Sequence, residues 1–168
     1  MKKIKWPKLN RNIHYWASGI CAIPLLIIII SGIFLQLRKD INWIQPATIK
    51  THIKTPSISF NQLLEKAKTV SEANINGWED INRVDYRPQK GIIKIKSNNH
   101  WEIQLNPKNA DILQVAYRRS DIIESIHDGT FFSKIVSLGV YLPTAILLLI
   151  LWFTGTYLFI KTILLKKK

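Results

Sequence analysis

Four histidines are the side chains of this sequence best suited to metal or cofactor chemistry. His14 precedes a long apolar run and His127 shortly precedes a second one, whereas His52 and His100 lie among polar residues. A haem b held in a membrane commonly takes two facing imidazoles as axial ligands. Their positions make His14 and His127 the candidates for haem ligation. The alternatives are an interfacial polar residue for His14 and a helix-terminal residue partnered by Glu124 or Asp128 for His127, and both alternatives are favoured over a metal role. We expect His52 and His100 to be surface residues.

Other catalytic arrangements have no counterpart in the sequence. No histidine pair has the H-E-x-x-H spacing, no serine lies in a nucleophile-elbow motif, and no glycine-rich phosphate loop occurs. Glu79 and Asp80 are adjacent, but neighbouring side chains point in different directions and make a poor carboxylate pair. We therefore expect neither catalysis by this chain alone nor a dedicated metal site. A protein without a cofactor and a haem protein are the two alternatives.

Two long apolar segments must position these histidines. Residues 15–37 and 135–160 contain no Asp, Glu, Lys or Arg, and a bilayer core needs about 20 apolar residues. The sequence predicts transmembrane helices over 15–37 and 133–160. No A-x-A cleavage site follows the first segment, so we interpret it as an uncleaved anchor. Six small residues could form a packing seam between the helices or simply be common there: Gly19, Ala22, Ser31, Gly32, Gly139 and Gly155.

The distribution of charge predicts the orientation in the membrane. The net charge is +13, and all 11 acidic residues lie between Asp40 and Asp128. Basic residues without acidic neighbours flank both spans, which places segments 1–14 and 161–168 in the cytoplasm and the middle of the chain outside it. Because the charge gathers at membrane ends, it indicates contact with membrane lipid and argues against binding of nucleic acid.

This arrangement separates the two candidate haem ligands. His14 lies at the inner end of the first span and His127 at the outer edge of the second, and a span of this length rises roughly 30–35 Å. One chain cannot clamp a single haem between them. A haem would need a homo-oligomer, a partner's histidine or a weaker second ligand. The single cysteine, Cys21, excludes a disulfide within the chain.

The exported part reads as a small α+β domain. Residues 38–56 resemble an extended connector, and residues 57–73 have the apolar spacing of a helix, with Ser59 and Gln62 suited to a capping box. Apolar and polar residues then alternate in four runs separated by turns, which predicts an antiparallel meander with one apolar face. The domain is expected over 57–119, and a short interfacial helix and turn over 120–132.

Basic residues mark the face of the meander opposite the helix. Arg83, Arg87, Lys94 and Lys96 alternate with the apolar strand positions, and acidic residues lie among them. One interpretation is a platform that binds an acidic peptide or an anionic ligand. The alternative is an ordinary solvated surface, which the interleaved acids favour.

Four segments together resemble a known family. They are L-N-R-N-I-H-Y-W at 9–16, N-P-K-N-A-D-I-L at 106–113, I-H-D-G-T-F-F at 126–132 and T-G-T-Y-L-F at 154–159. In this order, with two spans and a helix-plus-meander domain, the chain resembles the PepSY-associated transmembrane family in a small two-span form. The turn at 106–113 departs from the family's usual D-P-x-T-G-E-x-L style, with Asn106 for the acid and Ala110 for the glycine.

The resemblance implies a fold, a location and two functions. It implies two transmembrane helices flanking a small exported PepSY-like domain, in a bacterial inner membrane with that domain in the periplasm or outside the cell. PepSY domains are associated with binding or restraining peptidases, so the first implied function is binding or regulating a peptide, a protease or a membrane partner. Larger relatives carry haem on membrane histidines and are linked to reduction of iron-siderophores, which implies an electron-transfer subunit as the alternative.

Overall fold

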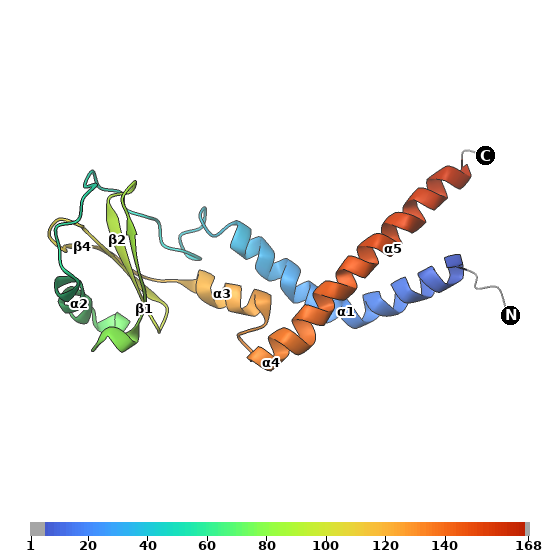
Figure 1. Cartoon of the computed structure of the whole chain (residues 1–168), viewed down its shortest axis with the longest axis horizontal. Coiled ribbons are helices and arrows are strands. Elements are labelled where there is room, and N and C mark those ends of the chain that lie inside the picture. The colour runs from blue at the N-terminus through green and yellow to red at the C-terminus, as the bar shows by residue number, and fades with distance from the viewer. Residues whose placement is uncertain (1–5, 167–168) are drawn as a thin grey trace. The chain divides into compact units, whose positions relative to one another are not determined.

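The structure is a computed structural model that describes residues 6–166 of the chain (Figure 1). Contacts divide the described residues into two compact units. The first contains the residues up to Ile33 and those from Glu124 onward, and the second is Phe34–Ile123. Each unit is described by itself below.

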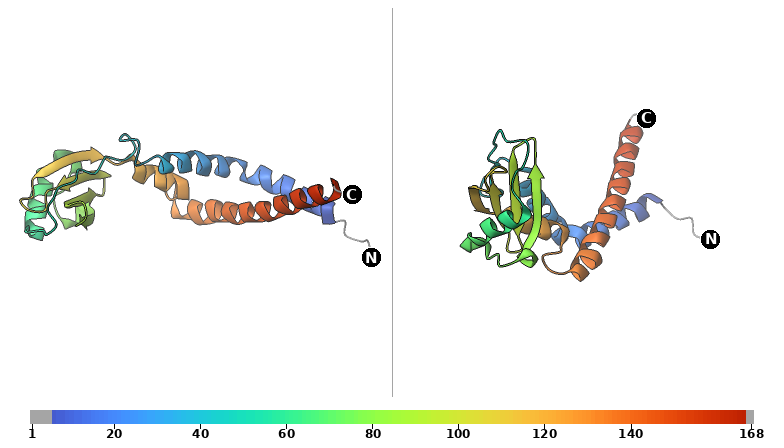
Figure 2. Two further views of the ribbon diagram at one scale, coloured as in Figure 1. Left: turned by 90° about the horizontal axis from the view of Figure 1, so that it is seen from above. Right: turned by 60° about the vertical axis from the view of Figure 1, so that its left-hand side comes forward.

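Two long helices dominate the first unit. Helix α1 spans Trp6–Gln36, and α5 spans Leu142–Lys166 after the short helix α4, Lys134–Val136, and the π-helical turn η3, Ser137–Tyr141 (Figures 1 and 2). The stretches Lys8–Gln36 and Lys134–Ile163 are long and apolar enough to cross a membrane. Most of their side chains are exposed, as expected of helices that face lipid. The two predicted spans are confirmed.

Small and polar residues line the buried stripe of each long helix. Ala17, Cys21 and Ser31 are buried on α1, and Tyr141 and Thr144 are buried on the η3–α5 segment. The spacings of four and ten residues on α1, and of three residues from Tyr141 to Thr144, keep these positions on one face of each segment. The predicted seam is wrong for Gly19 and Gly139, because a Cβ atom at either position would meet nothing within 4 Å.

The second unit is the predicted meander with one helix. Strands β1 (Ile81–Arg87), β2 (Ile92–Ser97), β3 (Trp101–Leu105) and β4 (Ile112–Tyr117) form one antiparallel sheet in the order β1-β2-β3-β4. Helix α2 spans Phe60–Lys68, and two 3₁₀ turns follow, η1 at Ser71–Ala73 and η2 at Trp78–Asp80. Helix α3, Arg119–Asp128, follows β4.

Local chemistry fixes the start of α2. The side chain of Ser59 accepts a hydrogen bond from the Gln62 backbone N–H, and the Gln62 side chain accepts one from the Ser59 N–H, so the predicted capping box is present. The helix is shorter than predicted because Thr69 ends it and the chain continues into η1. The core between α2 and the sheet includes Leu63, Ala67, Ile95, Ile103 and Leu105.

The second face of the sheet is covered, not solvated. The connector segment packs on it: the Gln104 side chain accepts a hydrogen bond from the Ile49 N–H and donates one to the Ala47 carbonyl, at 2.9 and 2.8 Å. The side chain of Ile44 is fully buried. The expectation of an ordinary solvated face is wrong for the centre of this face. The polar residues of the strands suggested exposure to water, but the covering segment buries them. The segment 38–56 is thus part of the compact unit Phe34–Ile123.

The turn at 106–113 has a backbone conformation that glycine favours. Ala110 has a φ of +58°, in the left-handed region that favours glycine, and its N–H donates to the Asn106 carbonyl at 3.0 Å. The Asn106 side chain accepts from the Lys108 N–H at 2.9 Å, a bond that a carboxylate would also accept. Ala110 thus adopts a conformation that glycine would adopt at lower cost, and Asn106 supplies the acceptor that an acid would also supply.

Candidate functional site

Each of the two candidate histidines contacts a hydroxyl group of another helix: His14 on α1 contacts α5, and His127 on α3 contacts α1. His14 Nδ1 lies 3.2 Å from Thr154 Oγ1 on α5, and His127 Nδ1 lies 3.0 Å from Ser31 Oγ on α1. A glycine follows each hydroxyl residue, and a Cβ atom at Gly155 or Gly32 would lie 3.6 or 3.4 Å from the Cε1 atom of the adjacent imidazole. A Cβ atom at either glycine would therefore be in ordinary van der Waals contact with the ring.

The hydroxyl groups determine which ring nitrogen carries the hydrogen. Thr154 Oγ1 donates to the Leu151 carbonyl at 3.1 Å, and Ser31 Oγ donates to the Ile27 carbonyl at 2.6 Å. Each hydroxyl hydrogen is thus engaged within its own helix, so the oxygen must accept from the histidine. Both imidazoles donate from Nδ1, and in the neutral form each carries its lone pair on Nε2.

The same nitrogen is the one that a metal would require. Metal-ligating histidines usually donate from one ring nitrogen to an acceptor that fixes their orientation and bind the metal through the other. His14 and His127 each fit the role of a single axial ligand by this criterion. The partners Ser31 and Thr154 were not assigned this role from the sequence, although each forms a hydroxyl-glycine dipeptide near one end of a span.

The two histidines do not converge on one site. His127 contacts α1 at Ser31, 17 residues beyond His14, which corresponds to about 25 Å along a helix. This separation agrees with the expectation that one chain cannot supply both ligands of one haem. Among the described residues, no group of three or more His, Cys, Asp or Glu side chains could hold a metal ion.

A buried ionic network occupies the covered face of the sheet. Lys94 Nζ donates to Glu102 Oε1 at 2.6 Å, and Arg118 Nη1 donates to Glu102 Oε2 at 2.5 Å. The side chains of Lys94 and Glu102 are 1% and 0% exposed. Asp121 extends the network, because it accepts from Arg118 at 3.1 Å and lies 3.3 Å from Lys96.

The network shifts the pKa values of its members. Burial is the largest influence on Lys94 and lowers its pKa, against the hydrogen bond from Lys94 to Glu102 that opposes the shift. Burial by itself would raise the pKa of Asp121, but the hydrogen bonds and positive charges of Arg118 and Lys96 together outweigh it and hold the pKa below its usual value. The network is therefore a largely buried structural cluster of paired acidic and basic side chains.

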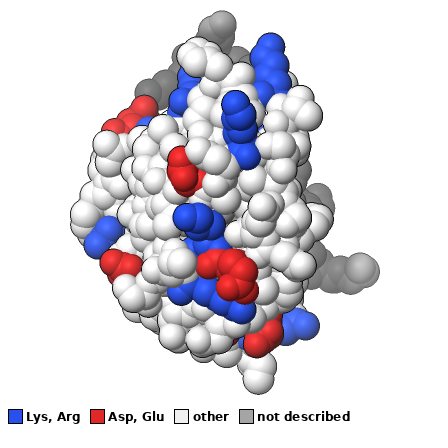
Figure 3. Space-filling model, turned by 90° about the vertical axis from the view of Figure 1, so that its left-hand side faces the viewer, with Lys and Arg blue, Asp and Glu red and all other residues white. Residues whose placement is uncertain are grey.

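The predicted basic platform divides into buried and exposed members. Lys94 cannot belong to an open surface, since its side chain is buried against Glu102, and most of the Lys96 side chain is buried beside Asp121. Arg83 and Arg87 remain accessible on β1, where both lie close to Asp85, at 3.0 and 3.7 Å. On the face shown in Figure 3, basic and acidic side chains lie among one another instead of forming a patch of one sign.

An apolar groove lies on the face of β1 opposite Arg83 and Arg87, and it was not predicted from the sequence. It has a volume of about 290 Å³ and is lined by Pro56, Ile58, Phe60, Leu63, Val84, Tyr86 and Ile93. Phe60 was expected in the core, yet it is 70% exposed and makes an edge-to-face contact with the half-exposed Trp78, at 6.0 Å between ring centroids. The exposure of Phe60 could have been inferred from its position directly after the N-cap residue Ser59, since this first position of the helix does not face the core.

Two apolar helices that flank a small domain of one helix on a four-stranded meander define a membrane-anchored α+β protein. The family model of the PepSY-associated TM region matches residues 11–167. The chain therefore belongs to this family and is a membrane protein with a PepSY domain. Comparison with curated proteins gives no match, and neither does comparison with solved structures.

Proposed function

We propose that this chain is a two-pass protein of the bacterial inner membrane whose PepSY domain binds an extended peptide segment of a protease or another membrane or exported partner. The observation that carries the proposal is the apolar groove beside the free edge of the sheet. The remaining support is the family membership and the charge distribution, which favours cytoplasmic segments on either side of an exported domain.

Strand β1 has the properties of a peptide-binding edge. It pairs with β2 alone, and within the described chain no other strand lies along its outer side. An exposed strand edge offers backbone N–H and C=O groups to an added strand, and pockets for alternate side chains then supply selectivity. The side chains of Val84 and Tyr86, which lie on the same face of β1, line the groove. An extended segment on β1 would thus place every second side chain against apolar walls.

The exposed aromatic residues provide the anchor for such a segment. Phe60 and Trp78 expose large ring surfaces to solvent in a domain whose core is otherwise closed. Aromatic side chains of this kind contribute strongly to binding because their burial releases much water at a small entropic cost. On the opposite side of the strand, Arg83 and Arg87 carry two positive charges and Asp85 carries one negative charge. This excess of positive charge favours acidic residues at the alternate positions of the bound peptide.

Fluorescence anisotropy with synthetic heptapeptides tests this proposal. The full-length protein in detergent is titrated with labelled peptides in which apolar residues alternate with Glu, and with matched peptides that carry Lys instead. We expect the Glu series to bind more tightly and Trp78→Ala to weaken binding about tenfold, the factor that corresponds to 1.4 kcal/mol. Trp43→Ala is the matched control, because Trp43 is 59% exposed and packs on Arg119 outside the groove. Equal weakening by both substitutions would contradict the proposal.

A second candidate function, haem-linked electron transfer toward iron, has support from the two histidines. The specific observation in its favour is the hydrogen bonding of Nδ1 in both His14 and His127, which leaves the lone pair of the neutral ring on Nε2. Bound haem would supply one-electron chemistry that no side chain of the protein provides. Each histidine would then need a second ligand from another copy or a partner.

An absorbance spectrum of the detergent-purified protein decides the second candidate. After expression with ample haem, a Soret band that is lost in His14→Ala or His127→Ala and kept in His52→Ala supports it, because His52 is an exposed residue of the domain. Absence of the band, or its persistence in both membrane variants, eliminates haem on these histidines.

A further inference from the structure

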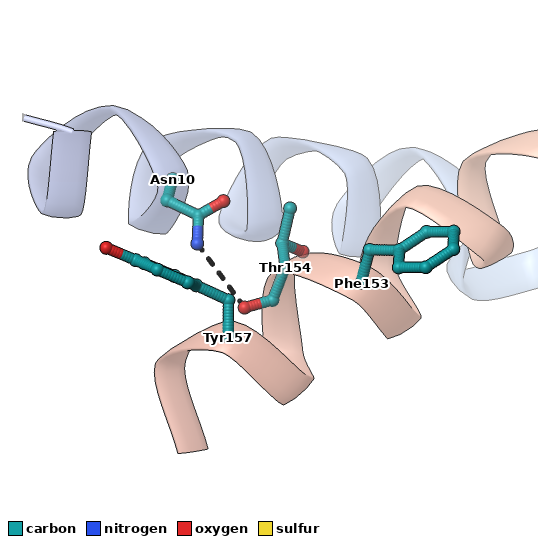
Figure 4. A pocket seen from close by; sticks show the side chains of 4 residues that line it. All are labelled: Asn10, Phe153, Thr154 and Tyr157. Atoms are coloured by element: carbon teal, nitrogen blue, oxygen red, sulfur yellow. Dashed lines mark hydrogen bonds between the residues drawn. The ribbon is translucent and has the colours of Figure 1, made fainter. Parts of the chain in front are cut away.

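An open pocket lies between the two membrane helices near the N-terminal part of α1 and the C-terminal half of α5. It has a volume of about 320 Å³ and is lined by Asn10, Phe153, Thr154 and Tyr157 (Figure 4). The Asn10 side chain donates to the Thr154 carbonyl at 3.3 Å, which joins the helices at the floor of the pocket. Figure 4 shows the rings of Tyr157 and Phe153 on opposite sides of Thr154.

The lining of this pocket is mostly apolar and includes a few polar groups. Phe153 and the ring of Tyr157 supply apolar walls, whereas the amide of Asn10 and the hydroxyl of Tyr157 supply polar groups. Tyrosine in a membrane helix commonly lies at the level of the lipid headgroups, with its ring toward the acyl chains and its hydroxyl toward water. The pocket therefore suits a molecule that is itself amphipathic and reaches it from the surrounding lipid.

Basic residues follow or precede the lining residues closely along both helices. Lys161 follows Tyr157 by one turn of α5, and its Nζ lies 6.0 Å from the centroid of the Tyr157 ring. Arg11 is exposed on α1 directly after Asn10, and Lys8 is exposed one turn earlier. No acidic residue occurs in 1–39 or 129–168, so nothing in either flanking sequence neutralises these cations.

We infer that the pocket binds an anionic phospholipid, with the phosphate toward Lys161 and Arg11 and an acyl chain along the Phe153 side. Uncompensated cations beside a membrane attract anionic headgroups with a free energy that corresponds to about fivefold in affinity for each basic residue. A zwitterionic lipid would fill the apolar walls without offsetting this charge. The inference is independent of the proposed peptide binding, because it concerns residues of the membrane unit alone.

Native mass spectrometry of the full-length protein in detergent tests the inference. The protein is titrated with dioleoyl phosphatidylglycerol and with dioleoyl phosphatidylcholine, which share the same acyl chains. We expect the anionic lipid to bind at least about fivefold more tightly, since at least one cation contacts its headgroup. Equal affinity for the two lipids would overturn the inference.

A pair of matched lysine variants locates the site. Lys161→Gln is expected to weaken binding of phosphatidylglycerol about fivefold and to leave phosphatidylcholine unaffected. Lys134→Gln removes the same charge where α4 begins, at the other end of the second span, and should change neither affinity. Tyr157→Leu removes the hydroxyl and the ring without altering charge and should also weaken binding of phosphatidylglycerol. Equal effects of Lys161→Gln and Lys134→Gln would show general attraction without a site and overturn the inference.

Discussion

The chemistry of His14 and His127 depends on two hydroxyl groups that donate their own hydrogens elsewhere. Because Thr154 bonds the Leu151 carbonyl and Ser31 bonds the Ile27 carbonyl, each oxygen is left as an acceptor for Nδ1–H. The arrangement fixes one tautomer of each neutral imidazole. It also leaves the same atom, Nε2, as the basic nitrogen in both.

Nitrogen-15 NMR of histidine-labelled protein measures this tautomer directly. We expect the neutral His14 and His127 rings to be protonated on Nδ1, with shifts that differ from those of the exposed His52. Thr154→Val keeps the shape of the side chain but removes the acceptor, so the His14 signal should move away from that of the Nδ1-protonated tautomer. The His127 signal should stay in place in that variant. A His14 spectrum that is unchanged by Thr154→Val would contradict the assignment.

Asp121 gives the domain a predicted dependence on acid. Its pKa lies below the ordinary value of 3.8, because Arg118 and Lys96 outweigh the opposing effect of burial. A carboxylate with a depressed pKa contributes stability above its unfolded-state pKa and loses it as the pH falls through the folded-state pKa. We therefore expect the stability of the sheet to fall as the pH is lowered below about 4, and Asp121→Asn to show less of this fall. Amide exchange of β4 and the start of α3 at graded pH measures the difference, and identical pH profiles would contradict it.

The strands and the helix of the domain could be predicted from the sequence, whereas the segment that covers the sheet could not. Alternation over 81–117 predicted the meander, and Ser59 with Gln62 predicted the start of α2, because both are short-range patterns. The covered face could not be predicted in this way. Its burial depends on Ile44 and Ala47 of an irregular segment that carries no period, and only the fold brings that segment onto Gln104.

Glu102 is the residue on which that covered face depends. It accepts hydrogen bonds from Lys94, Gln104 and Arg118 while its side chain is fully buried. Glu102→Gln removes the counter-charge of the buried Lys94 and one of the two carboxylate partners of Arg118, which should destabilise the domain by about 3 kcal/mol.

Arg83→Gln is the matched control for this substitution. It breaks an ion pair whose arginine is largely exposed and should cost less than about 1 kcal/mol. Hydrogen exchange of the β2 and β3 amides in the full-length protein compares the two variants. Similar protection in both would mean that the covered face is wetter than its geometry indicates.

Charge is distributed unevenly between the two units of the molecule, and the sequence already shows this distribution. The spans and the location of His14 and His127 near their ends could be predicted from residue types alone. The pairing of each histidine with a hydroxyl on another helix could not, because no local pattern reports which faces of two distant helices meet. Likewise, the groove beside β1 arises from the exposure of Phe60 and Trp78, which only the packed domain determines.

The predicted orientation in the membrane can be tested with single cysteines. Cys21 is the only native cysteine and is fully buried, so Cys21→Ala gives a background without reactive thiols. Asn109→Cys introduces a thiol on the exposed β3–β4 turn, and Asn12→Cys introduces one on the exposed basic side of α1, without altering any charge. Because basic segments stay in the cytoplasm, a membrane-impermeant maleimide should label position 109 in right-side-out spheroplasts and position 12 only after permeabilisation. Labelling of position 12 with protection of position 109 would invert the orientation and would place the peptide-binding groove in the cytoplasm, where an exported partner could not reach it.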